Sequence, residues 1–188
     1  MSNQSELPPI YSFPPLYTRQ PNGLIRRQQI NSWIEIILQY CISQKCWRMT
    51  AEGMPVGEPD VTKQSIFNNS SIQRVVPQVF VDEIWSQMCE EGKALGVQDG
   101  KRDSSQFYIL WRNLDSWASL ILQWFESSGS LNQVITIYEL SQGDGTADWE
   151  FHGMPEALVA HCLKPLCQRN RATLIKDERG IAVATKVV

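Results

Sequence analysis

The chain has 188 residues, of which 43% are hydrophobic and 20% charged, with a net charge of -3 at pH 7. This composition excludes a disordered tail and is typical of a globular protein, with a length that suits one large domain or two small ones. The acidic balance excludes a global positive field for nucleic acid, and no apolar run reaches the roughly 18–20 residues of a membrane span, so we expect an intracellular chain with protein partners.

The amino end carries two copies of a Pro-Pro-x-Tyr motif, the first from Pro8 to Tyr11 and the second from Pro14 to Tyr17. Proline favours polyproline II, a helix with three residues per turn and a rise of about 3.1 Å per residue. The six-residue offset therefore predicts that the two tyrosines lie on one face, roughly 19 Å apart. Such a pre-ordered segment loses little entropy when it docks in an apolar groove of a partner, and Phe13 adds contact area.

Two alternatives compete with docking on a partner. Prolines and aromatic residues also form straps within one molecule, so the segment would then pack on its own domain. The other alternative is a ligand for a WW domain, which binds proline-rich segments in an aromatic groove. The docking interpretation predicts these partner-binding residues in the segment: Pro8, Pro9, Tyr11, Phe13, Pro14, Pro15, Leu16 and Tyr17.

The next element is a helix whose pattern occurs twice. Apolar residues within 30–41 follow the i, i+3, i+4, i+7 spacing of a helix with one apolar face, and 114–125 repeats them at a constant offset of 84. Five positions are identical in the two copies, among them Trp33 and Trp117. Because neither helix is stable alone, each is expected to bury its apolar face within its own unit.

The segments that follow the two helices also correspond. Each helix is followed by a short β-rich segment, a further helical pattern and a β-hairpin. These lie at 46–49, 76–88 and 93–111 in the first unit, and at 134–138, 158–166 and 173–188 in the second. Pro165 lacks an amide proton and is expected to kink or shorten the helix in which it lies.

Three helices followed by a two-stranded wing form a winged helix, a variant of the helix-turn-helix. We therefore expect a mainly helical α+β protein with two tandem winged-helix domains, each with three helices and a small β-hairpin wing. The expected organisation is a proline-rich docking segment at 1–22, a first domain at 23–112 and a second domain at 113–188.

We predict no catalytic residues, no metal site and no cofactor. Neither His152 nor His161 has further ligands at a spacing that shares its face of a helix. Gly143 and Gly145 make half of a dinucleotide fingerprint, but no third glycine and no βαβ unit accompany them. The five cysteines are an odd number, and three of them fall in apolar helical patterns, so we expect reduced thiols.

Nucleic-acid binding is the usual function of a winged helix, through its last helix in the major groove. In the first unit the corresponding helix, at 77–91, carries four acidic residues and no basic one, which disfavours contact with a polyanion. In the second unit Lys164, Arg169 and Arg171 form either a small basic patch or a solvated helix face. Nucleic-acid binding therefore stays an alternative function.

Several long segments match one protein family. They include YSFPPLYTRQPN from Tyr11, DEIWSQM from Asp82 and DSWASLILQWF from Asp115. With these segments the chain resembles, over nearly its whole length, the small subunit of the endosomal sorting complex ESCRT-II in its budding-yeast form. Agreement is poor at 51–65 and 96–105, which the pattern already indicates as loops.

The resemblance implies a non-enzymatic subunit of two winged helices, present in two copies beside two larger ESCRT-II subunits. It implies that the proline-rich segment and the first domain dock on those larger subunits, and that Arg74, in an IQR motif, is an interface arginine. The second domain is implied to recruit the ESCRT-III subunit that starts filament assembly in multivesicular-body sorting. The resemblance further implies a cytoplasmic protein recruited peripherally to endosomes, which binds no nucleic acid and meets the membrane only through the complex.

Overall fold

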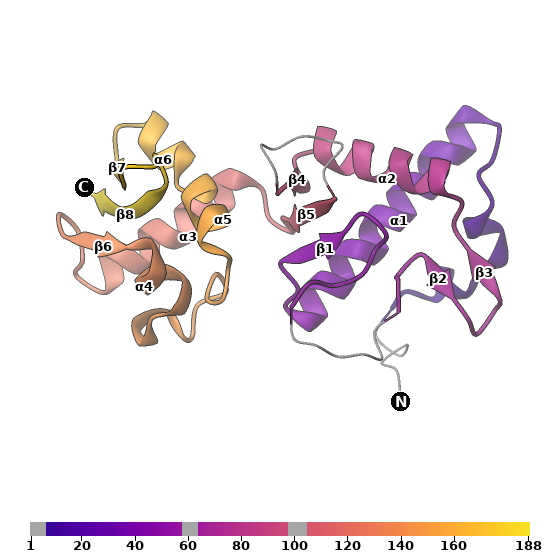
Figure 1. Ribbon diagram of the computed structural model, residues 1–188, viewed down its shortest axis with the longest axis horizontal. Helices are drawn as coiled ribbons and strands as arrows, with labels where there is room; N and C mark the ends of the chain where they lie inside the picture. Colours follow the sequence, from indigo (N-terminus) through magenta and orange to yellow (C-terminus); the bar gives the residue numbers. More distant parts are fainter. Residues whose placement is uncertain (1–6, 58–63, 98–104) are drawn as a thin grey trace. The chain divides into compact units, whose positions relative to one another are not determined.

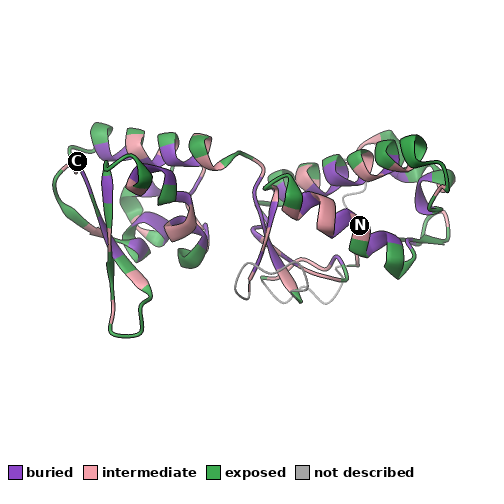
Figure 2. Ribbon diagram, turned by 90° about the horizontal axis from the view of Figure 1, so that it is seen from above, coloured by how far each residue is buried: buried purple, intermediate pink, exposed green. Residues whose placement is uncertain are grey.

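The computed structural model describes residues 7–57, 64–97 and 105–188, and the chain divides into two compact units, Met1–Trp111 and Arg112–Val188. Both units combine helices with small antiparallel sheets (Figure 1). This mixture confirms the predicted α+β class. Within each unit the buried positions line the inward faces of helices and strands (Figure 2).

The first unit is built on α1 (Gly23–Gln44), which extends well beyond the predicted helix at 30–41. The side chain of Asn22 caps the helix by accepting hydrogen bonds from two backbone amides of the first turn. The helix ends at Lys45, which adopts the left-handed conformation. Trp33 is fully buried in the middle of the helix and anchors the core of the unit.

A second helix and a three-stranded sheet complete that core. The helix, α2 (Gln78–Glu90), turns Phe80, Ile84 and Met88 inward along one stripe. In spatial order the strands of the antiparallel sheet are β1 (Arg48–Thr50), β5 (Gln106–Ile109) and β4 (Ala94–Gly96). The hairpin of β4 and β5 occupies the predicted position, and its predicted turn falls at 98–104, outside the described residues.

The first unit differs from the predicted plan between its two helices. Instead of a third α-helix, its described residues between α1 and α2 include a two-stranded ribbon of β2 (Asn68–Asn69) and β3 (Arg74–Val75). The backbone here bonds to distant partners rather than along a helix, since the carbonyl of Ile66 accepts from the Tyr11 hydroxyl. The expectation of three helices in this unit is therefore wrong for the described residues.

The second unit begins with α3 (Leu114–Ser127), whose N-cap is Asn113. Trp117 is fully buried in it, as Trp33 is in the first unit, so each repeated tryptophan lies in the core of its own unit. The helices that follow are α4 (Ile137–Gln142), α5 (Glu156–Cys162) and α6 (Lys164–Gln168). The predicted helix at 158–166 is divided at Leu163, two residues before Pro165 and in agreement with the predicted effect of that proline.

A three-stranded antiparallel sheet closes the second unit. In spatial order its strands are β6 (Val134–Thr136), β8 (Ala182–Val187) and β7 (Ala172–Lys176). The terminal hairpin of β7 and β8 was predicted. Thr185 and Val187 are fully buried, so β8 contributes side chains to the core of the unit.

The start of α4 provides a pH-dependent contribution to stability. The amide of Glu139 donates to Thr136 Oγ1, and the Glu139 carboxylate accepts from the amide and the hydroxyl of Thr136. These hydrogen bonds, that from the backbone amide first, lower the pKa of Glu139. This capping box therefore stabilises the folded state while the carboxylate is ionised.

Replacing Glu139 by glutamine should remove this pH dependence. A carboxylate with a lowered pKa in the folded state adds stability above its unfolded pKa of about 4.3 and loses it as the pH falls through the folded value. In urea unfolding, the difference in free energy between wild type and Glu139→Gln should therefore shrink from about pH 6 to about pH 3. Glu126→Gln, on the exposed face of α3, is the matched control, and an equal change in both variants would contradict the capping role.

Candidate docking surface

The proline-rich segment, residues 7–20, is called the strap below. It forms two 3-10 turns, η2 (Pro9–Ser12) and η3 (Pro14–Tyr17). Internal hydrogen bonds close these turns, the first running from the amide of Tyr11 to the carbonyl of Pro8 at 2.9 Å. Polyproline II contains no internal hydrogen bonds, so the predicted polyproline II conformation is wrong.

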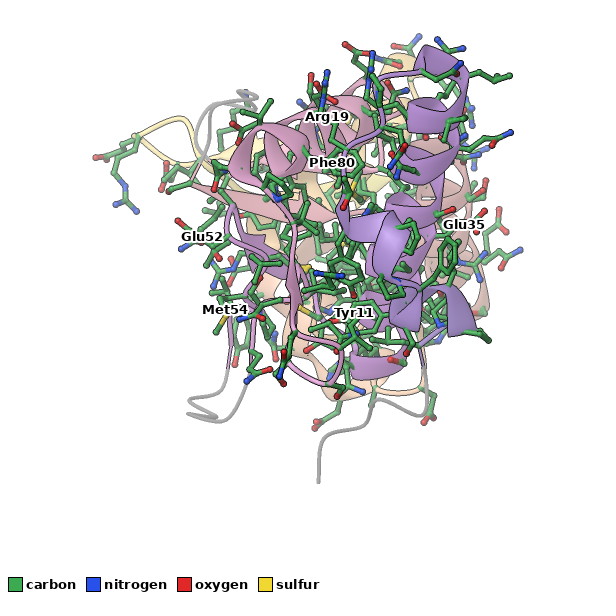
Figure 3. The ribbon with its side chains drawn as sticks, turned by 90° about the vertical axis from the view of Figure 1, so that its right-hand side faces the viewer. Tyr11, Arg19, Glu35, Glu52, Met54 and Phe80 are labelled. Atoms are coloured by element: carbon green, nitrogen blue, oxygen red, sulfur yellow. The ribbon has the colours of Figure 1, made fainter. Side chains whose placement is uncertain are left out.

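Both tyrosines of the strap point into the first unit. They lie on one face of the strap, although the strap consists of two separate turns and not of one continuous helix. Their ring centroids lie only 6.1 Å apart, however, and both rings pack edge-on against Trp33. Tyr11 is 7% exposed and Tyr17 2%, and Leu16 is buried beside them. Their predicted exposure is therefore wrong, and the strap packs on its own domain (Figure 3).

The two phenol groups are held by a buried hydrogen-bond network. The Tyr11 hydroxyl donates to the carbonyl of Ile66 at 3.0 Å, and the Tyr17 hydroxyl donates to the carbonyl of Tyr11 at 2.7 Å. The Asn69 amide donates to that same carbonyl and to the Tyr17 oxygen. Burial raises the pKa of both tyrosines. Both phenols therefore stay neutral at physiological pH, as buried hydrogen-bonded groups must.

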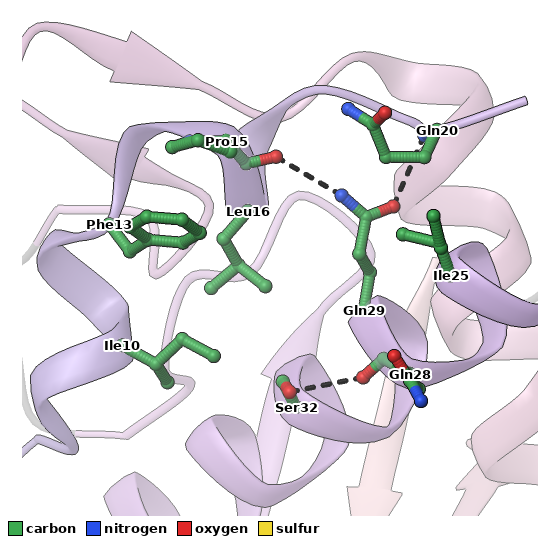
Figure 4. Close-up of a pocket in the computed structure, with 9 residues that line it drawn as sticks. All are labelled: Ile10, Phe13, Pro15, Leu16, Gln20, Ile25, Gln28, Gln29 and Ser32. Atoms are coloured by element: carbon green, nitrogen blue, oxygen red, sulfur yellow. Dashed lines mark hydrogen bonds between the residues drawn. The ribbon is translucent and has the colours of Figure 1, made fainter.

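Polar side chains of α1 fasten the outer side of the strap. Gln29 donates from its amide to the carbonyls of Pro15 (3.1 Å) and Thr18 (2.9 Å), and it accepts from the amide of Gln20 (Figure 4). The indole of Trp33 donates to the carbonyl of Leu16 at 3.1 Å. Side chains of α1 thereby bind the carbonyls of Pro15, Leu16 and Thr18, and the Pro15 carbonyl also accepts from the Thr18 amide within the strap.

The strap and α1 enclose an open groove of about 440 Å³ (Figure 4). Its apolar wall consists of Ile10, Phe13 and Pro15 from the strap and Ile25 from α1, and all four are exposed. Phe13, with 54% of its surface exposed, is the largest of these side chains. The groove therefore offers apolar area to a partner while the tyrosines hold the strap from beneath.

The structure divides the predicted docking residues into three groups. Pro9, Phe13, Pro15 and Arg74 are exposed, Pro8 and Pro14 are half-buried, and Tyr11, Leu16 and Tyr17 are buried. The sequence pattern did not predict Ile10 and Ile25, which the tertiary fold brings to the groove. Ile10 occupies the variable position of its motif, and Ile25 precedes the apolar pattern of the helix, so neither carried a signal.

Arg74 lies in a second exposed patch next to the strap. In the ribbon it pairs with Asn69, the residue that holds the tyrosines, and β3 contacts η3. Val75 and Val79 beside it are each 64% exposed. Within the described residues the Arg74 side chain has no ion pair, in contrast to Arg19, whose guanidinium lies 2.6 Å from Glu83. The patch therefore combines apolar area with an available positive charge.

The described residues contain no cluster of histidine, cysteine, aspartate and glutamate suited to a metal ion. His152 Nδ1 lies 3.0 Å from Thr146 Oγ1, and burial lowers the pKa of His161, so both histidines are accounted for by packing. No disulfide links the five cysteines, and burial raises the pKa of Cys162 to about 12. Among described helices, none combines the length and hydropathy of a membrane span.

Exposed apolar side chains beside an arginine are features of surfaces that bind other proteins. A family model described as "ESCRT-II complex subunit" matches residues 10–155. The chain belongs to this family of complex subunits, and it is a non-enzymatic scaffold, as predicted. The resemblance inferred from the sequence is thereby confirmed.

Relatives and solved structures agree with this assignment. Vacuolar protein-sorting-associated protein 25 of Saccharomyces cerevisiae is 58% identical, over 98% of this chain and 100% of its own length. The protein of the same name in Homo sapiens is 34% identical, over 96% of this chain and 98% of its own. The crystal structure of subunit VPS25 of the endosomal trafficking complex ESCRT-II superposes with a TM-score of 0.87 over 98% of this chain and all of that one.

A further match is the crystal structure of the endosomal complex ESCRT-II, which consists of VPS22, VPS25 and VPS36. The matching chain is 58% identical and superposes with a TM-score of 0.85, covering 98% of this chain and 100% of the other. The likeness therefore extends to a subunit solved inside its complex.

Truncating Tyr17 should destabilise the first unit although the residue lies in a terminal segment. Tyr17→Ala should lower the free energy of unfolding by about 3–5 kcal/mol, because a fully buried ring is lost from a packed core. Phe13→Ala, four residues away and exposed, should change it by less than about 0.5 kcal/mol. Urea unfolding followed by tryptophan fluorescence measures both. A wild-type midpoint for Tyr17→Ala would mean that the strap is not part of the core.

Proposed function

We propose that this chain is the small subunit of an ESCRT-II complex in multivesicular-body sorting, built from a docking segment at 1–22 and two winged-helix modules at 23–112 and 113–188, the first of which has the β2–β3 ribbon where a further helix was expected. The observation that carries the proposal is the strap, which is fixed from within by its tyrosines and presents Phe13 and Pro15 outward. Family membership supports the same role. The docking partners are counterparts of the VPS22 and VPS36 subunits that the solved complex contains.

The groove and the Arg74 patch together form the proposed docking surface. Phe13 and Ile10 supply apolar area that a partner side chain covers, because burying exposed apolar surface favours association. Arg74 supplies a planar guanidinium that binds a carboxylate of the partner through two parallel hydrogen bonds. β3 contacts η3, so Arg74 lies next to the strap that forms one wall of the groove. Tyr11 and Tyr17 act indirectly, because they position the strap.

The charges of the structure do not favour nucleic-acid binding. The exposed face of α2 includes Asp82, and Glu83 is already neutralised by Arg19. In the second unit Arg169 lies 2.6 Å from Asp115, and the guanidinium of Arg171 donates to the carbonyl of the last residue. Two of the three basic residues of the predicted patch are thus occupied, which weakens the phosphate contacts that such binding requires.

The second module is proposed to recruit the initiating ESCRT-III subunit at the cytoplasmic face of endosomes. Each complex holds two copies of this chain, so it presents two recruiting surfaces. Two linked sites raise the effective concentration of the ESCRT-III subunit without any new chemistry. Val134 and Tyr138 are exposed apolar residues of this module and are available for such a contact.

Substitutions on the docking surface should weaken assembly and leave folding intact. Phe13→Ala and Arg74→Ala should each raise the dissociation constant for the two larger subunits by about tenfold or more, since interface anchors of these types contribute at least about 1–2 kcal/mol. Thermal unfolding of the isolated variants should match wild type. Ile42→Ala, at an exposed position near the other end of α1, and Arg179→Ala, in the wing turn, are the matched controls. Co-purification unchanged by both docking variants would contradict the proposed surface.

Deletion of residues 1–18 would remove Tyr11 and Tyr17 from the core, so it would impair folding as well as docking. The copy number is therefore measured with the full-length chain, and native mass spectrometry of the assembled complex should give two copies of this subunit. A mass that fits one copy would contradict the proposed stoichiometry.

The two modules should separate the two proposed contacts. A chain that ends at Trp111 should still join the larger subunits and should fail to bind the ESCRT-III subunit, because its docking surface is complete without the second unit. The fragment Arg112–Val188 should bind the ESCRT-III subunit by itself. Pull-down with each purified partner measures both. Binding of the ESCRT-III subunit to the chain that ends at Trp111 would reject this division.

A further inference from the structure

One carboxylate, that of Glu83 on α2, joins the end of the strap to both helices of the first unit. Its Oε1 accepts from Arg19 in the strap, at 2.9 Å from Nε and 2.6 Å from Nη2. Its Oε2 lies 3.8 Å from Nε of Arg26 on α1. This second oxygen is buried and has no hydrogen-bond partner among the described residues, so the charge that compensates it is the guanidinium of Arg26.

Arg26 continues these contacts into the turn between the strap and α1. Its Nη1 donates to the carbonyl of Gln20 at 3.2 Å and to that of Pro21 at 3.1 Å. Residues 19–21 are therefore held by side chains from both helices. The set of Arg19, Arg26 and Glu83 is called the clasp below.

The turn that the clasp holds forms one end of the groove. Gln20 and Ile25 both line the groove, and Ile25 directly precedes Arg26 in α1 (Figure 4). Phe13 and Pro15 form the wall that the strap contributes. A shift of the turn would therefore move one wall of the groove relative to the other.

We propose that Glu83 is a positioning residue for docking, because through the clasp α2 holds the end of the strap and the start of α1 in the arrangement that presents the groove. This inference rests on the docking surface proposed above. Glu83 does not line the groove, so it acts through Arg19 and Arg26 and not by contact with a partner. An acidic residue of α2 thereby serves protein binding.

The exposure of the clasp limits the size of its effect. The side chain of Arg19 is 38% exposed and that of Glu83 30%, and ion pairs at such positions are weak and are screened by salt. Loss of the clasp should therefore leave the fold intact and loosen only the turn. Since a partner binds only the chains in which the turn is correctly placed, the effect should appear in the dissociation constant.

Glu83→Gln and Arg19→Gln, alone and combined, test this role. In isothermal titration calorimetry each single variant should raise the dissociation constant for the two larger subunits about two- to fivefold. The double variant should raise it no further than one single variant does, because the pair acts as a unit. These differences should vanish in about 1 M salt. Asp82→Asn, at an exposed neighbouring position, is the matched control and should bind as wild type does.

Hydrogen exchange supplies a readout that a general loss of stability would not give. In Glu83→Gln the amides of residues 16–26 should exchange faster, whereas those of β5 should exchange as in wild type. Thermal unfolding should shift by no more than about 5 °C. Arg19→Gln, at the more exposed end of the pair, allows the same measurements if Glu83→Gln unfolds.

Wild-type binding by both single variants, additive effects in the double variant, or faster exchange throughout the first unit would each overturn the positioning role. The docking surface is tested separately by Phe13→Ala and Arg74→Ala. If those two variants weaken docking and the clasp variants do not, only the role of Glu83 is wrong. If none of the four substitutions changes docking, the docking surface itself is wrong.

Discussion

The packing of Tyr11 and Tyr17 against Trp33 is the interaction on which the first unit depends. Three aromatic rings meet within about 6 Å and exclude water, and every phenol and indole donor among them has an acceptor. Burying these polar groups without partners would cost several kcal/mol, so the carbonyls of Leu16, Tyr11 and Ile66 are as necessary as the rings. A terminal segment thereby becomes part of the core.

This arrangement gives one short segment two opposite faces. The inward face holds the strap, and the outward face presents Phe13 and Pro15 beside α1. Because the same turns create both faces, the docking surface exists only in a folded first unit. A partner that binds it therefore selects folded chains.

The equivalent buried tryptophans of the two units have different neighbours. Trp33 is covered by the strap, whereas the equivalent Trp117 has the guanidinium of Arg112 at 5.8 Å from its ring. Arg112 is held by a bidentate pair with Glu150, whose shortest contact is 2.6 Å.

The sequence by itself determined the mixed class, the duplicated helices, the terminal hairpins and the division of the last helix at Pro165, because periodicity, turn residues and proline act within a few residues along the chain. It also determined the family. Only the tertiary structure decided the conformation of the strap, the ribbon that replaces a helix before α2, and the inclusion of Ile10 and Ile25 in the groove. Proline alone favours polyproline II, but Asn69 and Gln29, which hold the 3-10 turns, lie outside the segment, Asn69 58 residues after Tyr11 and Gln29 14 residues after Pro15. Local preferences were overruled here because the buried rings and their distant hydrogen bonds contribute more than the preference of a solvated chain.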